Sequence, residues 1–201
     1  MIAILASQNK NKIKEFNAIL EKYDLEVISR DDAGLPKDDV PEDGVTFEEN
    51  SMTKAAAIRK MIVDGGFKEY MNSPIIADDS GLMVEALGGE PGVYSARYAG
   101  PECNSSDNNA KLLAKLEGKS NRKACFVTVI TMLYPDGKVL VARGECPGEI
   151  ATETRGDGGF GYDPLFIAEG YDKTFSELGA DEKNKISHRA RALEKLEELL
   201  K

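Results

Sequence analysis

The sequence predicts an α/β fold, and its N-terminal segment carries the main evidence. A short apolar run from Ile2 to Ala6 is typical of a buried strand. The segment from about Asn9 to Lys22 has helical spacing of its apolar residues, which are Ile13, Phe16, Leu20 and Tyr23. A second apolar run, Leu25 to Ile28, follows it. A strand, a helix and a strand in this order favour the α/β class.

The next predicted elements are a loop and a second helix. Residues 30 to 44 are rich in Asp, Pro and Gly, which predicts a loop. Thr46 and Glu49 have the spacing of a capping box, so we expect a helix to begin there. Its buried stripe is expected to hold Ala55, Ile58 and Ile62.

The middle of the chain predicts two short strands and a third helix. PIIADD, which begins at Pro74, is expected to be one strand, and LMVEAL, which begins at Leu82, another. Ser105 to Leu116 is expected to be helical. One side of this helix is expected to carry Ala110, Leu113 and Leu116.

The last third of the chain predicts a long hairpin, a short strand and a C-terminal helix. ACFVTVITMLY and KVLVARGECPGEI flank the turn signal Pro135-Asp136-Gly137. DPLFI, from Asp163, is expected to be a strand, and a helix is expected from about Ser187. Its inward residues would be Ala190, Leu193, Leu196 and Leu200. No repeat or long linker interrupts the chain, so we expect a single domain over residues 1–201.

Composition narrows the class of protein. The chain has 201 residues, of which 41% are hydrophobic and 30% charged, as in ordinary globular proteins. Its net charge of −9 argues against a general nucleic-acid binder, which normally presents a basic face. No segment approaches the roughly 20 apolar residues needed to cross a bilayer. The N-terminus lacks the pattern of a secretory signal. We therefore expect a cytoplasmic protein with neither nucleic-acid nor membrane partners.

Cysteine usage agrees with this expectation. Cys103, Cys125 and Cys146 are far apart in the sequence and form no CxxC pair. Neither a disulfide framework nor a zinc site is expected.

The first candidate site is Ser7 to Lys12, at the junction of the first strand and the first helix. A helix N-terminus presents unpaired N–H groups, which suit phosphate, and Lys10 and Lys12 add positive charge. A plain N-cap with solvated lysines explains the same residues. The segment is not a Walker A loop, because GxxxxGK[ST] is absent.

Two further candidates lie near the C-terminus. GDGGFGYDP matches GxGxxG at Gly156, Gly158 and Gly161, but a strand-like run follows instead of the helix that a dinucleotide site requires. Either a flexible turn or the close approach of a ligand explains these glycines.

The stretch DEKNKISHRAR contains a cluster of Lys and Arg residues in an otherwise acidic chain, and it holds the single histidine, His188. A solvated, charge-laced helix start also explains these residues, and the local pattern alone favours it.

The fourth candidate is Asp78-Asp79-Ser80-Gly81, together with the acidic loop DDVPEDG upstream. Carboxylates from separate segments are what a Mg²⁺ site needs. The same four residues are also a common turn composition. The pattern alone leaves both interpretations open.

Taken together, the motifs are far more specific. In order along the chain they are Ser7-x-Asn9-x-x-Lys12, Thr46-Phe47-x-Glu49-Asn50 with Lys54, Ala77-Asp78-Asp79-Ser80-Gly81-Leu82, Leu87-Gly88-Gly89-x-Pro91-Gly92-x-Tyr94-Ser95-Ala96-Arg97-Tyr98, Gly158-Gly159-Phe160-Gly161-Tyr162-Asp163-Pro164, and Lys183 with Ser187-His188-Arg189. The set resembles the inosine triphosphate pyrophosphatase family over nearly the whole chain.

The resemblance implies a fold and a reaction that the residues alone did not. It implies an elongated, two-lobed α/β fold with a mixed twisted central sheet flanked by helices, a cleft between the lobes, and a homodimer. It also implies Mg²⁺-dependent hydrolysis of ITP, dITP and XTP to the monophosphate and pyrophosphate, which removes deaminated purines from the nucleotide pool.

Site residues follow from the resemblance position by position. Asp79 is implied as general base and metal ligand, and Glu42 as the second metal carboxylate, with Asp43 as its substitute. The implied substrate-binding residues are Ser7, Gln8, Asn9, Lys10, Asn11, Lys12, Ser80, Phe160, Gly161, Tyr162, Asp163, Lys183, His188 and Arg189. The family often has Gly where this chain has Gln8, and Pro41 occupies one usual metal-carboxylate position. The role of Asp78 stays open.

The proposed roles in base recognition have a chemical basis, although two other functions fit the same motifs. Phe160 would stack on the base, while His188 and Arg189 would offer donors to the carbonyl at position 6 of hypoxanthine. The alternatives are a pyrophosphatase for other modified or pyrimidine nucleotides, and a nucleotide sensor without catalysis. A sensor would not need both Asp79 and a second acidic ligand.

Overall fold

The computed structural model describes residues 1–7, 10–38, 40, 42–157 and 160–201, without the side chains of Lys10 and Asn11. Its strands are β1 (Ile2–Leu5), β2 (Glu26–Ser29), β3 (Ile75–Val84), β4 (Lys123–Leu133), β5 (Val139–Ile150) and β6 (Phe166–Ala168). Its α-helices are α1 (Lys10–Leu20), α2 (Phe47–Asp64), α3 (Ser105–Lys115), α4 (Phe175–Leu178), α5 (Ala180–Ile186) and α6 (His188–Leu200). Short 3₁₀ turns are η1 (Glu21–Tyr23), η2 (Lys68–Tyr70), η3 (Glu85–Leu87) and η4 (Gly92–Arg97).

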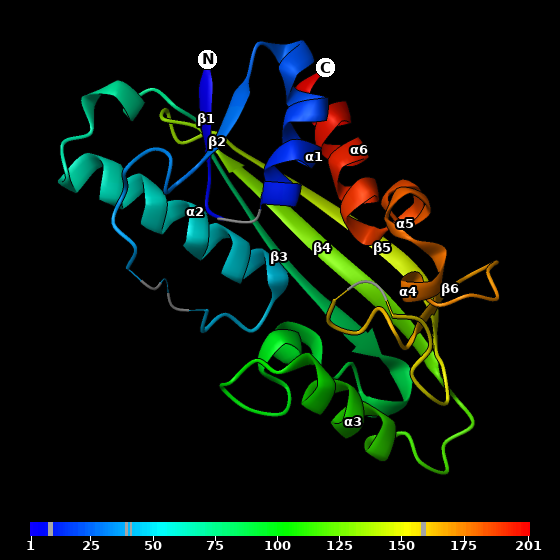
Figure 1. Cartoon of the computed structure of the whole chain (residues 1–201). Helices are drawn as coiled ribbons and strands as arrows, with labels where there is room; N and C mark the ends of the chain where they lie inside the picture. The colour runs from blue at the N-terminus through cyan, green and yellow to red at the C-terminus, as the bar shows by residue number, and fades with distance from the viewer. Residues whose placement is uncertain (8–9, 39, 41, 158–159) are drawn as a thin grey trace. The chain divides into compact units, whose positions relative to one another are not determined.

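The strands of the described residues form one mixed sheet with helices packed against it (Figure 1). The strand order is β2-β1-β3-β4-β5-β6. β1 runs parallel to β2 and β3, whereas β6 runs antiparallel to β5. The predicted α/β class and mixed sheet are confirmed.

The chain divides into two compact units. Unit 1 comprises Met1–Asp79, Val129–Arg143 and Ala192–Lys201, and unit 2 comprises Ser80–Thr128 and Gly144–Arg191. Strands β3, β4 and β5 and helix α6 therefore each contribute residues to both units. The segments of each unit are interleaved along the chain.

Unit 1 buries apolar residues on both faces of its strands. On β1, Ala3 and Leu5 pack with α1 and the C-terminal part of α6, while Ile4 packs with α2. This division follows from the alternation of side chains along a strand. α1 and α6 lie side by side (Figure 1), and Phe16 and Leu20 of α1 are fully buried.

Unit 2 has its own core, rich in aromatic side chains. Phe126 and Phe175 both pack edge-on against Phe166, with ring centroids 4.6 and 4.9 Å from its ring. Leu112 and Leu116 of α3 join the same core. Such edge-to-face contacts add to the burial of apolar area.

Most predicted elements are confirmed, with five corrections. PIIADD and LMVEAL belong to one continuous strand, β3, because Asp78 to Gly81 stay extended and 3₁₀ geometry begins only at Glu85. DPLFI is a strand only from Phe166, and helices α4 and α5 were not predicted. On α3 Ala110 is exposed, and Asn108 and Asn109 take the buried face with Leu112 and Leu116. On α6 Ala190 and Leu200 are only half-buried.

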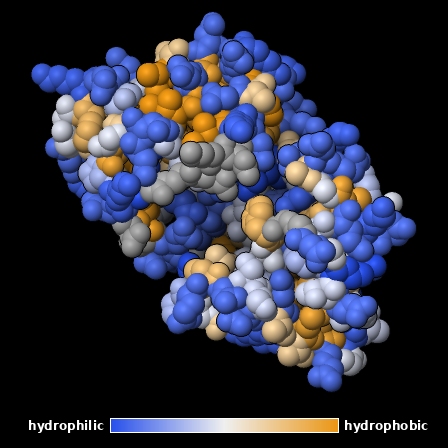
Figure 2. Space-filling model, in the orientation of Figure 1, coloured by the Kyte–Doolittle hydropathy of each residue, from blue (hydrophilic) through white to orange (hydrophobic). Residues whose placement is uncertain are grey.

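Hydrophilic residues cover most of the face shown in Figure 2, as expected for a chain with 30% charged residues. Among the described residues, no helix combines the length and the apolar character that crossing a membrane requires.

Candidate active site

The two adjacent aspartates of β3 lie within the strand and have different partners. Asp78 accepts two hydrogen bonds from Lys12 Nζ of α1, at 2.8 and 2.7 Å. Asp79 instead contacts α2, through Lys54 and Asn50. Since neighbouring side chains in a strand point to opposite faces, each carboxylate meets a different helix. The turn interpretation of this stretch is wrong.

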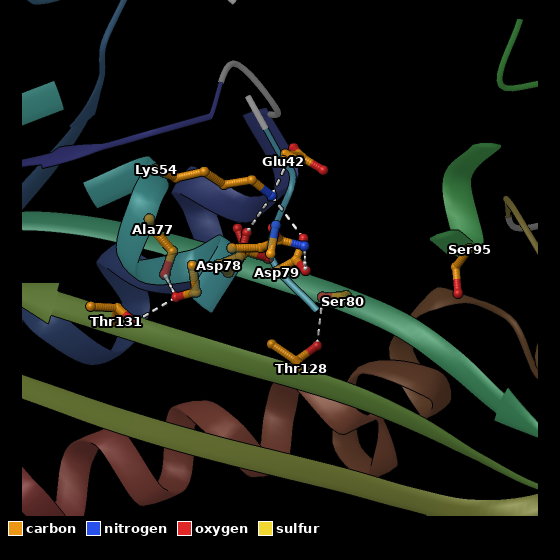
Figure 3. A network of polar contacts seen from close by, with 12 residues as sticks. Glu42, Lys54, Ala77, Asp78, Asp79, Ser80, Ser95, Thr128 and Thr131 are labelled. Carbon is orange, nitrogen blue, oxygen red and sulfur yellow. Dashed lines mark hydrogen bonds and ion pairs between the residues drawn. The ribbon is translucent and has the colours of Figure 1, made fainter. Parts of the chain in front are cut away.

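Asp79 belongs to a cluster in unit 1 that we call the carboxylate–lysine cluster, made of Glu42, Asn50, Lys54 and Asp79. Lys54 Nζ lies 2.8 Å from Asp79 Oδ1 and 2.9 Å from Glu42 Oε1, between the two carboxylates (Figure 3). Asn50 Nδ2 donates to the other Asp79 oxygen at 3.2 Å. Both oxygens of Asp79 are therefore oriented from α2.

Local sequence explains why α2 presents these two side chains together. Asn50 and Lys54 are four residues apart, so they share one face of the helix. The predicted capping box is present, with the Thr46 hydroxyl accepting from Glu49 N and the Glu49 carboxylate accepting from Thr46 N. The capping box fixes the first turn of α2, which begins at Phe47, three residues before Asn50.

The loop that carries Glu42 is tied to the same helix. Gly44 N donates to Asn50 Oδ1 at 2.9 Å. A side chain at position 44 would clash, because a Cβ there would lie 2.7 Å from that same oxygen and 2.8 Å from Glu49 Cβ. The glycine lets the loop approach α2 closely, which brings Glu42 to Lys54.

The electrostatics of this cluster depend on burial and on its own charges. Burial raises the pKa of Asp79 above its usual value, and the nearby Lys54 and Asn50 only partly offset this. Burial alone would lower the pKa of Lys54, but the attraction of Asp79 and Glu42 outweighs it, so the Lys54 pKa is raised. The lysine therefore stays charged between its two carboxylates.

The donor set of this cluster fits a divalent cation of the Mg²⁺ type. Glu42 and Asp79 come from separate segments and converge on a single positive charge. Mg²⁺ is typically held by one or two carboxylates, with water and substrate phosphate completing its ligands. Asp43, the alternative to Glu42, is exposed. No group of three or more His, Cys, Asp or Glu with metal-binding geometry occurs among the described residues.

The predicted phosphate segment is only partly described. Ser7 is half-buried and follows the end of β1, and Lys12 lies in the first turns of α1, paired with Asp78. Gln8 and Asn9 lie outside the described residues, as do the side chains of Lys10 and Asn11. Of the two lysines in this segment, Lys12 is the one whose ammonium group the structure describes.

Unit 2 contains a cavity of about 230 Å³ that we call the unit 2 pocket. An engineered protein cavity of about 150 Å³ accommodates benzene, so this pocket has room for a larger ring system. Its lining residues are Ser80, Gly81, Ser95, Ala96, Cys103, Ser105, Asn108, Phe126, Phe160, Gly161, Tyr162, Asp163, Lys183, His188 and Arg189. Every residue from position 80 onward that was predicted to bind substrate lines it.

The pocket combines aromatic faces with cationic groups. The Phe160 ring is 65% exposed, and Lys183 Nζ lies 4.5 Å from its centroid. The His188 ring stacks on Phe126, with centroids 4.7 Å apart and an interplanar angle of 13°. A planar ring with polar edges suits this combination of stacking surfaces and donors.

Hydrogen bonds hold the segment from Phe160 to Asp163 in place. The buried Asp163 carboxylate accepts from Lys183 Nζ and, at 3.0 Å, from Phe160 N. Tyr162 OH donates to Ser95 O at 2.8 Å. Burial raises the pKa of this tyrosine, so it remains a neutral donor.

Sequence reasoning missed several residues that the structure places at these sites. Asn50 and Lys54 belong to one of the family motifs, but no catalytic or binding role was predicted for them. Ser95, Asn108 and Phe126 line the pocket, yet they are a serine in a turn, a polar residue in a helix and an aromatic residue in a strand. Of these three residues, only Ser95 lies in a family motif, Tyr94-Ser95-Ala96-Arg97, that could have indicated a place at the site.

Comparison with known proteins supports the resemblance. The model of the Ham1 family matches residues 3–199. A protein from Clostridium perfringens named dITP/XTP pyrophosphatase is 50% identical, with 98% of this chain and 96% of that protein covered. One of the same name from Bacillus subtilis is 46% identical with the same coverage of both chains.

Solved structures agree with this result. The Ham1 protein of Staphylococcus aureus superposes with a TM-score of 0.88 at 43% identity, covering 100% of this chain and 98% of that one. The match with the nucleoside-triphosphatase, or dITP/XTP pyrophosphatase, of Mycobacterium abscessus has a TM-score of 0.78 at 38% identity, covering 100% of both chains. The fold, the ordered motifs and these matches lead to one conclusion: the chain belongs to the Ham1 family.

Proposed function

We propose that this chain hydrolyses dITP, XTP and ITP to the nucleoside monophosphate and pyrophosphate, and so removes deaminated purines from the nucleotide pool. The observation that carries the proposal is the unit 2 pocket, where an exposed aromatic ring stands among cationic groups. The names of relatives up to 50% identical over nearly the whole chain support it. Residues 1–201 would act as a single pyrophosphatase domain.

The base is proposed to bind in the unit 2 pocket, against Phe160. Hypoxanthine and xanthine carry a carbonyl at position 6, where adenine carries an amino group. Donors from His188 and Arg189 pair with a carbonyl and face another donor when adenine binds. Mismatched buried polar groups of this kind discriminate by about 10⁴-fold.

The triphosphate is proposed to engage the carboxylate–lysine cluster and the start of α1. Asp79 ends the first segment of unit 1, and Ser80, a lining residue of the unit 2 pocket, follows it directly in the chain. A triphosphate carries about four negative charges, which a net charge of −9 would repel unless cations gather locally. Lys12 and the segment from Ser7 to Asn11 are proposed to supply that attraction.

A Mg²⁺ ion held by Asp79 and Glu42 would neutralise phosphate charge and lower the pKa of a bound water. Asp79 is proposed to orient the attacking water and to accept its proton. Asn50 and Lys54 keep the Asp79 carboxylate in one orientation, as their contacts at 3.2 and 2.8 Å indicate. Positioned general-base help of this kind contributes about 10²–10⁴-fold.

A nucleotide panel tests the proposal. Pyrophosphate and orthophosphate release are measured from ITP, XTP, dITP, GTP, dUTP and dCTP, with and without Mg²⁺. The proposal expects pyrophosphate from the first three, and only with Mg²⁺. Preference for a pyrimidine nucleotide would establish the alternative pyrophosphatase, and tight ITP binding without any release would establish a sensor.

Two further expectations remain proposals. We expect a homodimer, which light scattering coupled to size-exclusion chromatography measures directly, and a mass of about 22 kDa, that of the 21.9 kDa chain, would contradict it. We also expect the protein in the cytoplasmic fraction of cells.

A further inference from the structure

The buried face of α3 holds a polar residue, Asn109, that has no role in the proposed reaction as described above. Asn109 is only 6% exposed, and its Nδ2 donates to Gly161 O at 2.9 Å. Its Oδ1 is buried and has no hydrogen-bond partner among the described residues. An unsatisfied buried amide oxygen costs stability, so packing alone does not explain an asparagine at this position.

The bond from Asn109 fixes the orientation of one peptide unit. In a trans peptide the C=O and the N–H point in opposite directions. When Gly161 O points at Asn109, the N–H of Tyr162 therefore points away from α3. Asn109 is not a lining residue of the unit 2 pocket, whereas Gly161 and Tyr162 both are.

The Tyr162 N–H has no acceptor within the described part of the chain, although its neighbours are engaged. Asp163 N donates to Phe160 O at 3.2 Å, and Tyr162 OH donates to Ser95 O. The Tyr162 side chain and the following residue are thus held, while the described residues leave the Tyr162 N–H without an acceptor and so available to a ligand.

Gly161 makes an external restraint on this peptide necessary. Its φ is +62°, in the left-handed region, and nothing lies within 4 Å of where a Cβ would be. Glycine adopts both signs of φ with little cost, so the peptide between Gly161 and Tyr162 is free to rotate unless something holds its carbonyl. Asn109 supplies that restraint.

We propose that Asn109 is a specificity-determining positioning residue: it holds the Gly161–Tyr162 peptide so that Tyr162 N–H donates to the carbonyl at position 6 of the purine. The inference rests on the proposed function and extends it to a backbone donor. A backbone N–H has no acceptor capacity, so it discriminates a carbonyl from an amino group more strictly than a hydroxyl or amide side chain could.

The test compares two substrates that differ at position 6 and in the proton that the 6-oxo base carries on N1. ITP has the carbonyl, and purine riboside triphosphate has hydrogen at position 6. In Asn109→Leu, kcat/KM for ITP falls about tenfold, as expected for one lost hydrogen bond, while kcat/KM for purine riboside triphosphate changes less than about twofold. A parallel fall with both substrates, or no change with either, overturns the proposal, because a merely structural role affects both alike.

The matched control is Asn17→Leu in unit 1. Asn17 Nδ2 donates to Val27 O at 2.9 Å, so this variant also removes an asparagine bond to a backbone carbonyl, far along the chain from the pocket residues. The ratio of the two substrates is expected to stay at the wild-type value. If Asn109→Leu does not fold, Asn109→Ser replaces it, with the same two outcomes.

A second readout uses the wild-type protein and needs no turnover. With ¹⁵N-tyrosine labelling, IMP is expected to move the Tyr162 amide resonance downfield, and purine riboside monophosphate is not. Equal shifts with the two ligands overturn the proposal even if the protein hydrolyses ITP. Absence of pyrophosphate release from every nucleotide would overturn the proposed function instead, and this binding comparison would still decide the role of Tyr162 N–H.

Discussion

At the scale of single residues, two neighbouring carboxylates have separate tasks because a strand turns its side chains to alternate faces. Asp78 pairs with Lys12, and Asp79 with Lys54 and Asn50. Two adjacent carboxylates beside a buried apolar run would repel each other and resist burial unless their charges were compensated. Each has its own cation on a different helix, before any metal ion or phosphate is considered.

The first residue-scale prediction concerns Asp79. Asp79→Asn keeps the shape and one acceptor oxygen for α2 but removes the carboxylate that accepts the proton, so kcat for ITP is expected to fall by about 10²–10⁴-fold. Circular dichroism and thermal unfolding should show the fold intact. A variant that keeps half of the wild-type kcat would remove Asp79 from the proposed role.

The second concerns the pair of Lys12 and Asp78. The Asp78 side chain is 2% exposed and that of Lys12 is 20% exposed, so their interaction is only partly screened by water. Urea unfolding of Asp78→Asn, Lys12→Met and the double variant is expected to give a coupling energy of about 1–3 kcal/mol, typical of hydrogen bonds to charged groups. Additive effects would show that the two side chains do not stabilise each other.

The third concerns the cysteines, which carry free thiols. Cys103 is exposed and lines the unit 2 pocket, whereas burial raises the pKa of Cys146 to about 11. A raised thiol pKa leaves little thiolate below that pH, so Cys146 reacts slowly until pH approaches 11 or the protein unfolds. At pH 8, mass spectrometry should find iodoacetamide on Cys103 first, and IMP should slow that reaction. Alkylation of Cys103 at an unchanged rate with IMP would place the ligand elsewhere.

At the scale of elements, periodicity predicted the helices that face the core with apolar residues. Ile58 and Ile62 of α2, and Leu193 and Leu196 of α6, are buried as expected. It failed where polar residues take the buried face, as Asn109 does on α3, because hydrophobic spacing has no signal for a side chain buried to hold a backbone carbonyl. It also failed at β3, where turn composition did not produce a turn.

At the candidate site, too, the sequence predicted some features and not others. The motifs identified the side chains of the pocket from Phe160 onward, which the fold gathers from three separate segments. The partner of each aspartate was not predictable, because it depends on which helices flank β3 and on where the loop of Glu42 lies. These are tertiary relations that local patterns do not contain.

The element-scale prediction concerns the capping box of α2. Thr46→Ala removes the acceptor for Glu49 N and is expected to lower the free energy of unfolding by about 1 kcal/mol. Denaturant titration measures this change, with Val45→Ala as control, since that neighbouring side chain is 76% exposed. An unchanged midpoint would mean that the box does not stabilise the helix.

At the scale of the whole molecule, the two units are interleaved along the chain, which passes between them within β3, β4, β5 and α6. A fragment ending at Asp79 would lack the parts of β4, β5 and α6 that complete the core of unit 1. The proposed division of labour follows the same boundary, with phosphate chemistry assigned to residues of unit 1 and base recognition to those of unit 2.

The proposed function requires base recognition by unit 2 residues and hydrolysis at Asp79 to act on the same nucleotide. The test measures pyrophosphate release from dITP and dATP by the wild type and by Asp79→Asn, and the affinity of the variant for each nucleotide. We predict that the wild type with Mg²⁺ favours dITP over dATP in kcat/KM by at least about 10³-fold, and that Asp79→Asn loses turnover yet still binds dITP in preference to dATP. Equal turnover of dITP and dATP by the wild type, or loss of the binding preference in Asp79→Asn, would contradict it.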